Sequence, residues 1–295
     1  MASLAPLRLE GPPIAFDYKT HPPGKGALSY DSYLKVRALT DLQHLISDPP
    51  HHDEMLFIVI HQTYELWFKQ LLHEIDTITG MIRSGQTLAA ARLLGRCAEI
   101  EKVLIGQVSI LETMTPMDFL AFRNRLAPAS GFQSRQFREF EYVLGLREPG
   151  YLADHQDDPE ALAHLEQRLM EPSLPEVFFG LLRQRGFDAP PLPDGDPDRP
   201  DAAVARERRI VALKGLYEDF EAHYDLFLLA EALLELDLQF QVWRRRHVLM
   251  VERIIGGRRG TGGSSGASYL KTTLEKRAFP ELWDVRTSMS AHHTY

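Results

Sequence analysis

Two stretches of the sequence repeat apolar side chains at the spacing of an α-helix, and they limit the folds that are open to the chain. The first runs from His51 to about Ser84, and the second runs almost unbroken from Ala202 to Ile255, long enough for two helices. Residues three and four apart share one helical face, so each stretch predicts amphipathic helix. Alternating β patterns and Asn-Gly hairpin turns are absent throughout. The sequence therefore predicts an all-α fold.

Further helices are predicted around these stretches by the same spacing and by signals at their ends. Asp48-Pro49-Pro50 is expected to end the helix that starts near Tyr30, because proline ends helices and disfavours helix in the residue before it. Thr115-Pro116 has the pattern of an N-cap followed by proline at the first helical position. The other expected helices cover about 87–113, a segment through 137–144, short pieces between 149 and 186, residues 269–276 and a final turn in FPELWDVRT.

Three segments lack helical pattern. Residues 1–28 are rich in proline and glycine, and residues 189–200 (APPLPDGDPDRP) are rich in proline and aspartate. Residues 256–266 contain six glycines. Neither side of 189–200 carries enough pattern to stand apart, so we expect a surface loop there and one helical domain over 1–295.

Composition excludes several classes of function. The formal net charge of −8 and the pI near 5.8 give no electrostatic basis for binding nucleic acid. No apolar run approaches the roughly 20 residues that span a bilayer, and the N-terminus lacks the pattern of a signal peptide. Cys97 is the single cysteine, which excludes an intramolecular disulfide and fits a reducing cytoplasm.

The histidines do not form the common metal motifs. None has a glutamate three residues before it, as helical di-iron sites require, and H-E-x-x-H is absent. His61 and His247 stand alone on apolar helical faces, where a histidine is more often an ordinary core residue than a ligand. Heme iron, however, takes a single axial histidine in a helical pocket, with a second residue shaping the other side.

The glycine-rich segment 256–266 admits more than one interpretation. A phosphate-binding loop would need Gly-Lys-Ser/Thr after a strand, and the dinucleotide fingerprint fails because its last glycine is replaced by Ser265. A flexible linker remains open. So does a mobile loop that closes over a pocket and excludes water, with Arg258, Arg259 and Thr261 serving a small anionic substrate.

Four segments of the sequence together resemble one known family. They are MLFIVIHQTYELWFKQLLHE, FRNRLAPASGFQSRQFREFEYVLG, QFQVWRRRHVLMVERIIGGRRGTGGSSG and FPELWDVRT. In this order they closely resemble the bacterial tryptophan 2,3-dioxygenases, and the resemblance runs from about Tyr30 to Thr287. HHDEMLFI, SGFQS and RGTGGSSG are long and uncommon motifs, so the resemblance is specific.

The resemblance implies an all-helical, cytoplasmic heme b enzyme that is active with ferrous iron and assembles as a homotetramer. Such an enzyme inserts both atoms of O2 across the indole C2–C3 bond of L-tryptophan. The product is N-formylkynurenine, in the first step of tryptophan degradation by the kynurenine route. Neither nucleic acid nor a membrane is an implied partner.

The resemblance also implies roles for individual residues. His247 corresponds to the axial heme ligand, and His61 to the distal histidine that hydrogen-bonds the indole N–H. Phe57 corresponds to a residue packed beside the indole. Arg123 corresponds to the arginine that holds the substrate carboxylate, for which a planar guanidinium is suited. Thr261 corresponds to a threonine at the amino-acid end of the substrate.

Five further residues correspond to other parts of the family's active site. Ser130 and Gly131 match a turn beside heme and substrate. The N-terminal segment that completes a neighbouring subunit's pocket is matched by Tyr30, Tyr33 and Leu34.

Phe119 departs from the family pattern, because a tyrosine is expected there beside the substrate arginine. Loss of that hydroxyl removes one polar contact near the carboxylate, and we expect weaker substrate binding at most. Two alternatives remain open from the sequence: a heme dioxygenase of the same fold acting on another indole, and a non-catalytic protein that binds heme or indole.

Overall fold

The computed structural model describes residues 28–193, 199–263 and 265–289. Residue contacts divide the chain into two compact units, residues 1–44 and 45–295. The predicted irregular segment 1–28 lies outside the described residues except for Leu28, as do 194–198 of the proline-rich segment and 264 of the glycine-rich one. Every regular element in the described residues is helical, which confirms the all-α prediction. That 1–295 forms one domain stays a prediction.

The described part of the N-terminal unit contains the short helices α1 (Tyr30–Leu34) and α2 (Val36–Leu39). The prediction of a single helix from near Tyr30 to the prolines at 49 and 50 is therefore wrong. Lys35 interrupts it in the left-handed conformation, with φ 56°, and its N–H donates to the Asp31 carbonyl at 2.7 Å. Beyond α2 the apolar side chains stay largely exposed, so no packed face stabilises further helix.

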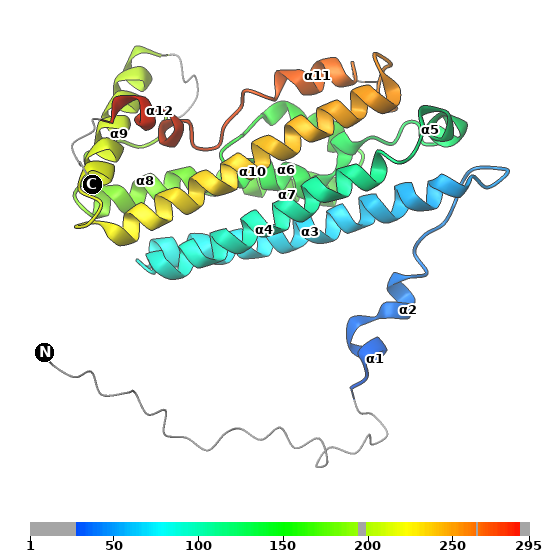
Figure 1. Cartoon of the computed structure of the whole chain (residues 1–295), viewed down its shortest axis with the longest axis horizontal. Helices are drawn as coiled ribbons and strands as arrows, with labels where there is room; N and C mark the ends of the chain where they lie inside the picture. The colour runs from blue at the N-terminus through cyan, green and yellow to red at the C-terminus, as the bar shows by residue number, and fades with distance from the viewer. Residues whose placement is uncertain (1–27, 194–198, 264, 290–295) are drawn as a thin grey trace, which may run out of the picture. The chain divides into compact units, whose positions relative to one another are not determined.

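Three long helices form the body of the larger unit. They are α3 (His52–Arg83), α4 (Thr87–Leu111) and α10 (Tyr224–Ile255), and α4 packs along both of the others (Figure 1). Gly85 turns the chain from α3 into α4 with φ 75°, a conformation that glycine adopts without strain. The first stretch with a strong helical period is thus one long helix, and the second divides into α9 (Pro200–Glu218) and the long helix α10.

Shorter helices cover this body. Helices α6 and α8 pack on α3, α7 packs on α6, and α12 packs on α9. Thr115 caps α5 in a capping box with Asp118, as predicted from the Thr-Pro pair. The remaining elements are α5 (Pro116–Arg123), η1 (Gly131–Gln133), α6 (Arg135–Val143), η2 (Pro149–His155), α7 (Pro159–Met170), α8 (Leu174–Gln184), α9 (Pro200–Glu218), α11 (Ala267–Thr272) and α12 (Pro280–Ser288).

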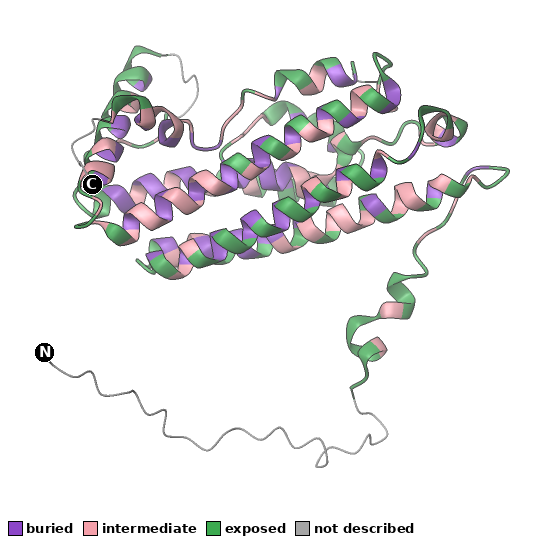
Figure 2. Ribbon diagram, in the orientation of Figure 1, coloured by how far each residue is buried: buried purple, intermediate pink, exposed green. Residues whose placement is uncertain are grey.

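The core lies between the facing sides of the long helices (Figure 2). A large cluster joins α3, α4 and α10 to α6, α8, α9 and α12, and a smaller one joins the start of α3, the end of α4, α5 and the end of α10. Tyr64 packs against both clusters. Burial of these aliphatic and aromatic side chains is the main stabilising contribution to the helix packing.

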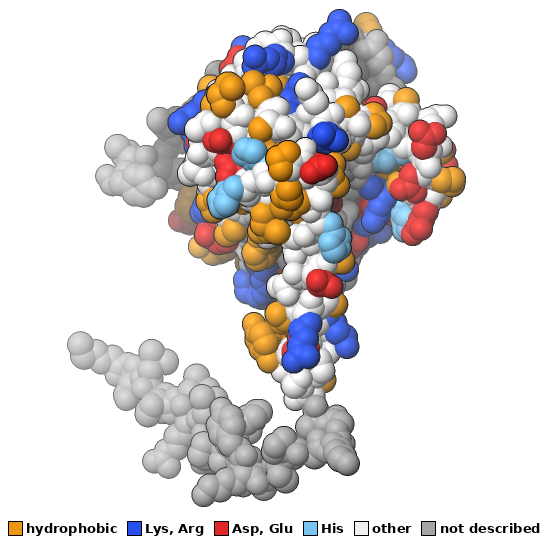
Figure 3. Space-filling model, turned by 90° about the vertical axis from the view of Figure 1, so that its right-hand side faces the viewer, with side chains coloured by type: hydrophobic (Ala, Val, Ile, Leu, Met, Phe, Trp, Pro, Cys, Tyr) orange, Lys and Arg blue, Asp and Glu red, His pale blue; other side chains and the backbone are white. Residues whose placement is uncertain are grey.

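The surface of the larger unit is mixed in character. Figure 3 shows one face, where side chains of both charge signs lie among scattered hydrophobic ones. Aliphatic side chains are exposed on the outer sides of all three long helices: Met55, Val59 and Leu66 on α3, Leu88, Val103 and Ile110 on α4, and Leu238, Val242 and Leu249 on α10. None of the described helices is both long enough and apolar enough to cross a membrane.

Candidate functional site

A cavity of about 310 Å³ lies between the first half of α3 and the last third of α10. Helices α5, α6 and α11, the turn before η1 and the glycine-rich segment also contribute to its lining. His61 and His247 both line this cavity, so the fold brings together the two histidines that the sequence singled out. Arg123, Ser130, Gly131, Phe119 and Thr261 line it too.

His247 contributes a neutral ring to the cavity. Burial, with a smaller contribution from the nearby His61, lowers the pKa of His247 to about 4, because the charged imidazolium loses its hydration. The ring is stacked on Trp243, one turn earlier, at a centroid distance of 5.1 Å and an interplanar angle of 7°. No residue in the described part of the chain hydrogen-bonds its ring nitrogens. A neutral nitrogen therefore remains available as a ligand.

His61 is held in one tautomer by its own helix. Its Nδ1 lies 2.7 Å from the carbonyl oxygen of Phe57, and because a carbonyl only accepts, Nδ1 carries the proton and donates it. Nε2 is then the acceptor. Burial lowers the pKa of His61, and the Phe57 carbonyl and the Glu65 carboxylate partly offset this. At neutral pH the side chain presents a neutral acceptor nitrogen.

The cavity suits a flat cofactor that is bound through one metal ligand. Its walls are largely aromatic and aliphatic, and it offers single neutral imidazoles instead of a cluster. In the described residues no three His, Cys, Asp or Glu side chains come together in a way that could hold a bare metal ion. A heme needs one axial histidine and apolar walls, so the residues present fit that group.

The polar end of the cavity is formed by α5 and the glycine-rich segment. Arg123 Nη2 donates to the carbonyl of Arg259. Thr261 Oγ1 donates to the Ala129 carbonyl at 2.6 Å. These two contacts hold the glycine-rich segment over the turn that carries Ser130 and Gly131, so the fold assembles the predicted substrate end of the site.

Close approach explains two of the glycines in this segment. A Cβ added to Gly262 would lie 2.5 Å from the Cβ of Ser130, and one added to Gly266 would lie 2.4 Å from the Arg258 carbonyl oxygen. Gly266 also has φ 65°, where other residues are strained. The glycine content therefore lets the segment close tightly on Ser130 and on itself.

Phe57 and Phe119 belong to an aromatic cluster beside His61. The rings of Phe57 and His61 are 4.0 Å apart, and Phe57, Phe119 and Phe122 lie 5.5 to 5.7 Å from one another. Phe119 lines the cavity, whereas Phe57 lies behind it and is not part of the lining. The predicted contact of Phe57 with an indole stays a prediction.

The three predicted residues of the N-terminal segment lie on α1, in the smaller unit. Tyr30 is 77% exposed, Tyr33 is 69% exposed and Leu34 is 46% exposed. Their expected place in a neighbouring subunit's pocket stays a prediction.

Sequence reasoning missed a group of charged residues in the cavity lining. Arg138, Glu141 and Arg244 all line the cavity, and all three are buried. Arg138 and Glu141 are three residues apart on α6, a spacing equally typical of a surface ion pair. Nothing in the sequence places α6 against α10, so only the fold reveals this group.

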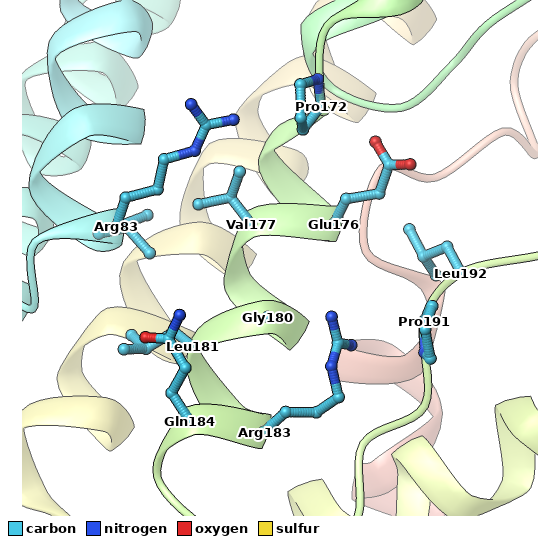
Figure 4. Close-up of a pocket in the computed structure, with 11 residues that line it drawn as sticks. Arg83, Pro172, Glu176, Val177, Gly180, Leu181, Arg183, Gln184, Pro191 and Leu192 are labelled. Carbon is cyan, nitrogen blue, oxygen red and sulfur yellow. The ribbon is translucent and has the colours of Figure 1, made fainter.

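A second hollow, of about 370 Å³, lies between the end of α3 and α8 (Figure 4). Two of its polar side chains, Arg183 and Glu176, already have protein partners. Arg183 donates to the Ala189 carbonyl at 3.0 Å, and Glu176 accepts from Ser173 and pairs with Arg147. It contains no histidine, so the cavity between α3 and α10 is the better candidate for catalysis.

Comparison with known proteins shows which family the chain resembles. The sequence profile of the tryptophan 2,3-dioxygenases matches residues 17–173 and 196–289. The chain is 47% identical to the tryptophan 2,3-dioxygenase of Nocardioides sp. over 267 residues, which are 89% of the chain and 95% of that protein. It is 43% identical to the enzyme of Caulobacter vibrioides, covering 89% and 98%, and 40% identical to that of Bacillus thuringiensis, covering 95% and 99%.

The contact between Gly262 and Ser130 gives a test of how the glycine-rich segment is held. Gly262→Ala should displace the segment, since overpacking of this kind typically costs about 1–3 kcal/mol. Trypsin cleavage after Arg258 and Arg259 should then accelerate roughly tenfold. Gly257→Ala is the matched control, because a Cβ there meets nothing within 4 Å. Equal cleavage rates in both variants would contradict the closed placement.

Proposed function

The chain belongs to the tryptophan 2,3-dioxygenase family, and on this premise we propose that the cavity between α3 and α10 is its catalytic site. The chain is a dioxygenase that oxidises tryptophan at the head of the kynurenine route. The proposal in full is insertion of both atoms of O2 across the indole C2–C3 bond of L-tryptophan, giving N-formylkynurenine. The observation that carries it is the presence of His61 and His247, each neutral, in the lining of one cavity.

We assign His247 as the residue that would hold a heme b through its iron. Its neutral ring, its position in the cavity and its stacking on Trp243 support this assignment. Ferrous heme supplies the activation of O2, and the protein supplies binding, orientation and exclusion of water. The apolar walls contributed by α3 and α10 suit a porphyrin.

His61 is assigned the task of orienting the indole. Its Nε2 is an acceptor because Nδ1 donates to the Phe57 carbonyl, so Nε2 suits the indole N–H. The indole N–H is too weakly acidic for efficient proton removal by an imidazole. Orientation is therefore the better role for His61 than general base.

Arg123 and Thr261 are assigned to the amino-acid end of the substrate. A guanidinium forms two parallel charge-assisted hydrogen bonds with a carboxylate, which fixes both position and angle. The glycine-rich segment, which Arg123 contacts and which carries Thr261, would cover the pocket and keep water out. Phe119 offers an apolar surface in place of a hydroxyl.

A homotetramer in which α1 reaches a neighbour's site is part of the proposal. The exposed Tyr30 and Tyr33 on α1 support it, as do the exposed aliphatic side chains on the outer sides of the long helices. The single cysteine, Cys97, fits a cytoplasmic location.

The proposal is tested by the visible spectrum of the protein loaded with heme, under ascorbate and air, before and after addition of L-tryptophan. We expect a heme Soret band, and then new absorbance from N-formylkynurenine. A heme band with tryptophan-dependent shifts but no product would indicate a binding protein, and turnover of tryptamine instead of L-tryptophan would indicate another indole as substrate. His247→Ala should lose the stable heme band. Retention of an unchanged band would contradict the assignment of the axial ligand.

Arg123→Lys tests the carboxylate contact. We expect the KM for L-tryptophan to rise by about one order of magnitude or more, because the bidentate pair is lost. Heme binding should be unchanged. Arg125→Lys is the matched control, since Arg125 is exposed and absent from the cavity lining. An unchanged KM in Arg123→Lys would defeat the assignment.

His61→Ser distinguishes orientation from proton removal. We expect the rate to fall roughly tenfold, the value of a lost hydrogen bond, without being abolished. The Soret band of the variant shows whether heme is still bound. A complete loss of turnover with heme in place would instead support a general base.

A further inference from the structure

The cavity lining contains a buried charged cluster that the proposed reaction does not use, formed by Arg138 and Glu141 on α6 and Arg244 on α10. These side chains are among the most deeply buried charges of the chain, at 3%, 4% and 3% exposure respectively. Buried ions need partners, because removal from water costs several kcal/mol per ion. The charges and hydrogen-bond partners of this cluster therefore indicate what kind of ligand it could bind.

Two cations in the cluster share one anion. Glu141 accepts from Arg138 Nη1 through Oε2 at 2.5 Å and pairs with Arg244 Nη2 through Oε1 at 2.8 Å. The three groups carry two positive charges and one negative charge, which leaves an excess of one positive charge. That excess lies in the wall of a largely apolar cavity.

Neighbouring carboxylates do not balance this charge within ion-pair distance. Asp237 acts on Arg244 only from farther away, and its oxygens accept from the backbone N–H groups of Ala278 and Phe279 and from Trp283 Nε1. On α6 itself, Glu139 pairs with other arginines outside the cluster. The remaining nearby cation, the Lys276 ammonium, has its own partner in Glu148.

Among the bonds of the described residues, Arg138 leaves three of its five N–H groups unused, and Arg244 leaves two. Arg244 uses Nη1 for the carbonyls of Thr273 and Lys276, at 3.1 and 3.0 Å, and Nη2 for Glu141. Arg138 uses Nη1 for Glu141, and its Nε reaches the Phe132 carbonyl only at 3.5 Å. Within the described ranges no acceptor meets Arg138 Nη2.

Aromatic contacts fix Arg138 in this position. Its Cζ lies 3.8 Å from the ring centre of Tyr151, whose hydroxyl accepts from Tyr269 at 2.8 Å. Tyr269 and Tyr151 also line the cavity. The guanidinium is thus held over an aromatic ring, with N–H donors left over and a positive charge that no ion pair balances.

We propose that Arg138 is an anion-binding residue and that its anion is a propionate carboxylate of the heme. This inference rests on the proposed function, since heme is taken as the occupant of the cavity. The carboxylate would supply the missing negative charge and an acceptor for Nη2. Arg244 is a positioning residue, because it takes up part of the charge of Glu141 and so leaves Arg138 free to bind.

The test compares the binding of two porphyrins by the wild-type protein and by a variant. Apoprotein is titrated with heme b and, separately, with heme dimethyl ester, whose propionates carry no charge, and the Soret band gives both dissociation constants. The wild-type protein should bind heme b about 10 to 100 times more tightly than the ester, as one buried charge-assisted contact requires. Arg138→Met should weaken binding of heme b by about the same factor while changing binding of the ester little.

Arg135→Met is the matched control. Arg135 lies on the same helix and pairs with Glu139, but its side chain is 36% exposed and does not line the cavity. This variant should keep the full preference for heme b. Equal weakening of both porphyrins in Arg138→Met, with the preference retained, would overturn the proposal by showing a structural role only.

A second variant covers the case in which Arg138→Met does not fold, as judged by its far-UV circular dichroism. Arg138→Lys keeps the charge but loses the planar set of donors, so the preference for heme b should fall several-fold. An unchanged preference would overturn the proposal. Failure of the proposed function looks different, because the wild-type protein would then form no stable Soret complex with either porphyrin.

Discussion

The site depends on the packing of α10 against α4 and, through α4, against α3. The buried residues of α10 run from Leu226 to Ile255, so one rigid element reaches from the large core cluster to the far end of the cavity. His247 lies in the last third of α10, so the packing of the preceding two-thirds of the helix fixes its position. His61 lies nine residues into the 32-residue helix α3, so the packing of the longer part of that helix fixes its position. Long helices therefore set the relation of the two histidines, and a short loop would not fix it as closely.

The buried charged side chains around the cavity contribute little to the stability of the fold. Replacing a buried ion pair by apolar residues is often neutral or stabilising, so the cluster of Arg138, Glu141 and Arg244 is weak support for the fold. Its members sit instead at the edge of an apolar cavity, on two different helices. Glu65 is similar: it accepts from Ser134 and Gln136 and ties the start of α6 to α3, beside His61. Polar contacts here determine positions around the cavity.

Much of the fold could be predicted from the sequence, because periodicity, capping and proline signals act within a few residues. The ends of α3 and the Thr115 cap follow from such local signals, whereas the break between α9 and α10 falls in a stretch whose helical pattern is almost unbroken. The break at Lys35 does not follow from such signals either, since a lysine in the left-handed conformation has no local signature. His61 and His247 stand out as lone histidines on apolar helical faces, the family resemblance assigns roles to them and to Arg123 and Thr261, and all four line one cavity. Arg138 and Arg244 escaped notice because their meaning depends on α6 lying against α10, a contact that no local pattern encodes.

The guanidinium of Arg123 connects the glycine-rich segment to the substrate in the proposed site. One N–H of Nη2 is used by the Arg259 carbonyl. A guanidinium has five N–H donors, so enough remain for a bidentate carboxylate while the segment stays bound. A carboxylate would also draw the guanidinium into a fixed plane, which favours the segment's closed placement. Substrate binding and closure then reinforce each other through one side chain. Phe119 takes no part in this linkage, and its missing hydroxyl removes a contact without breaking the connection.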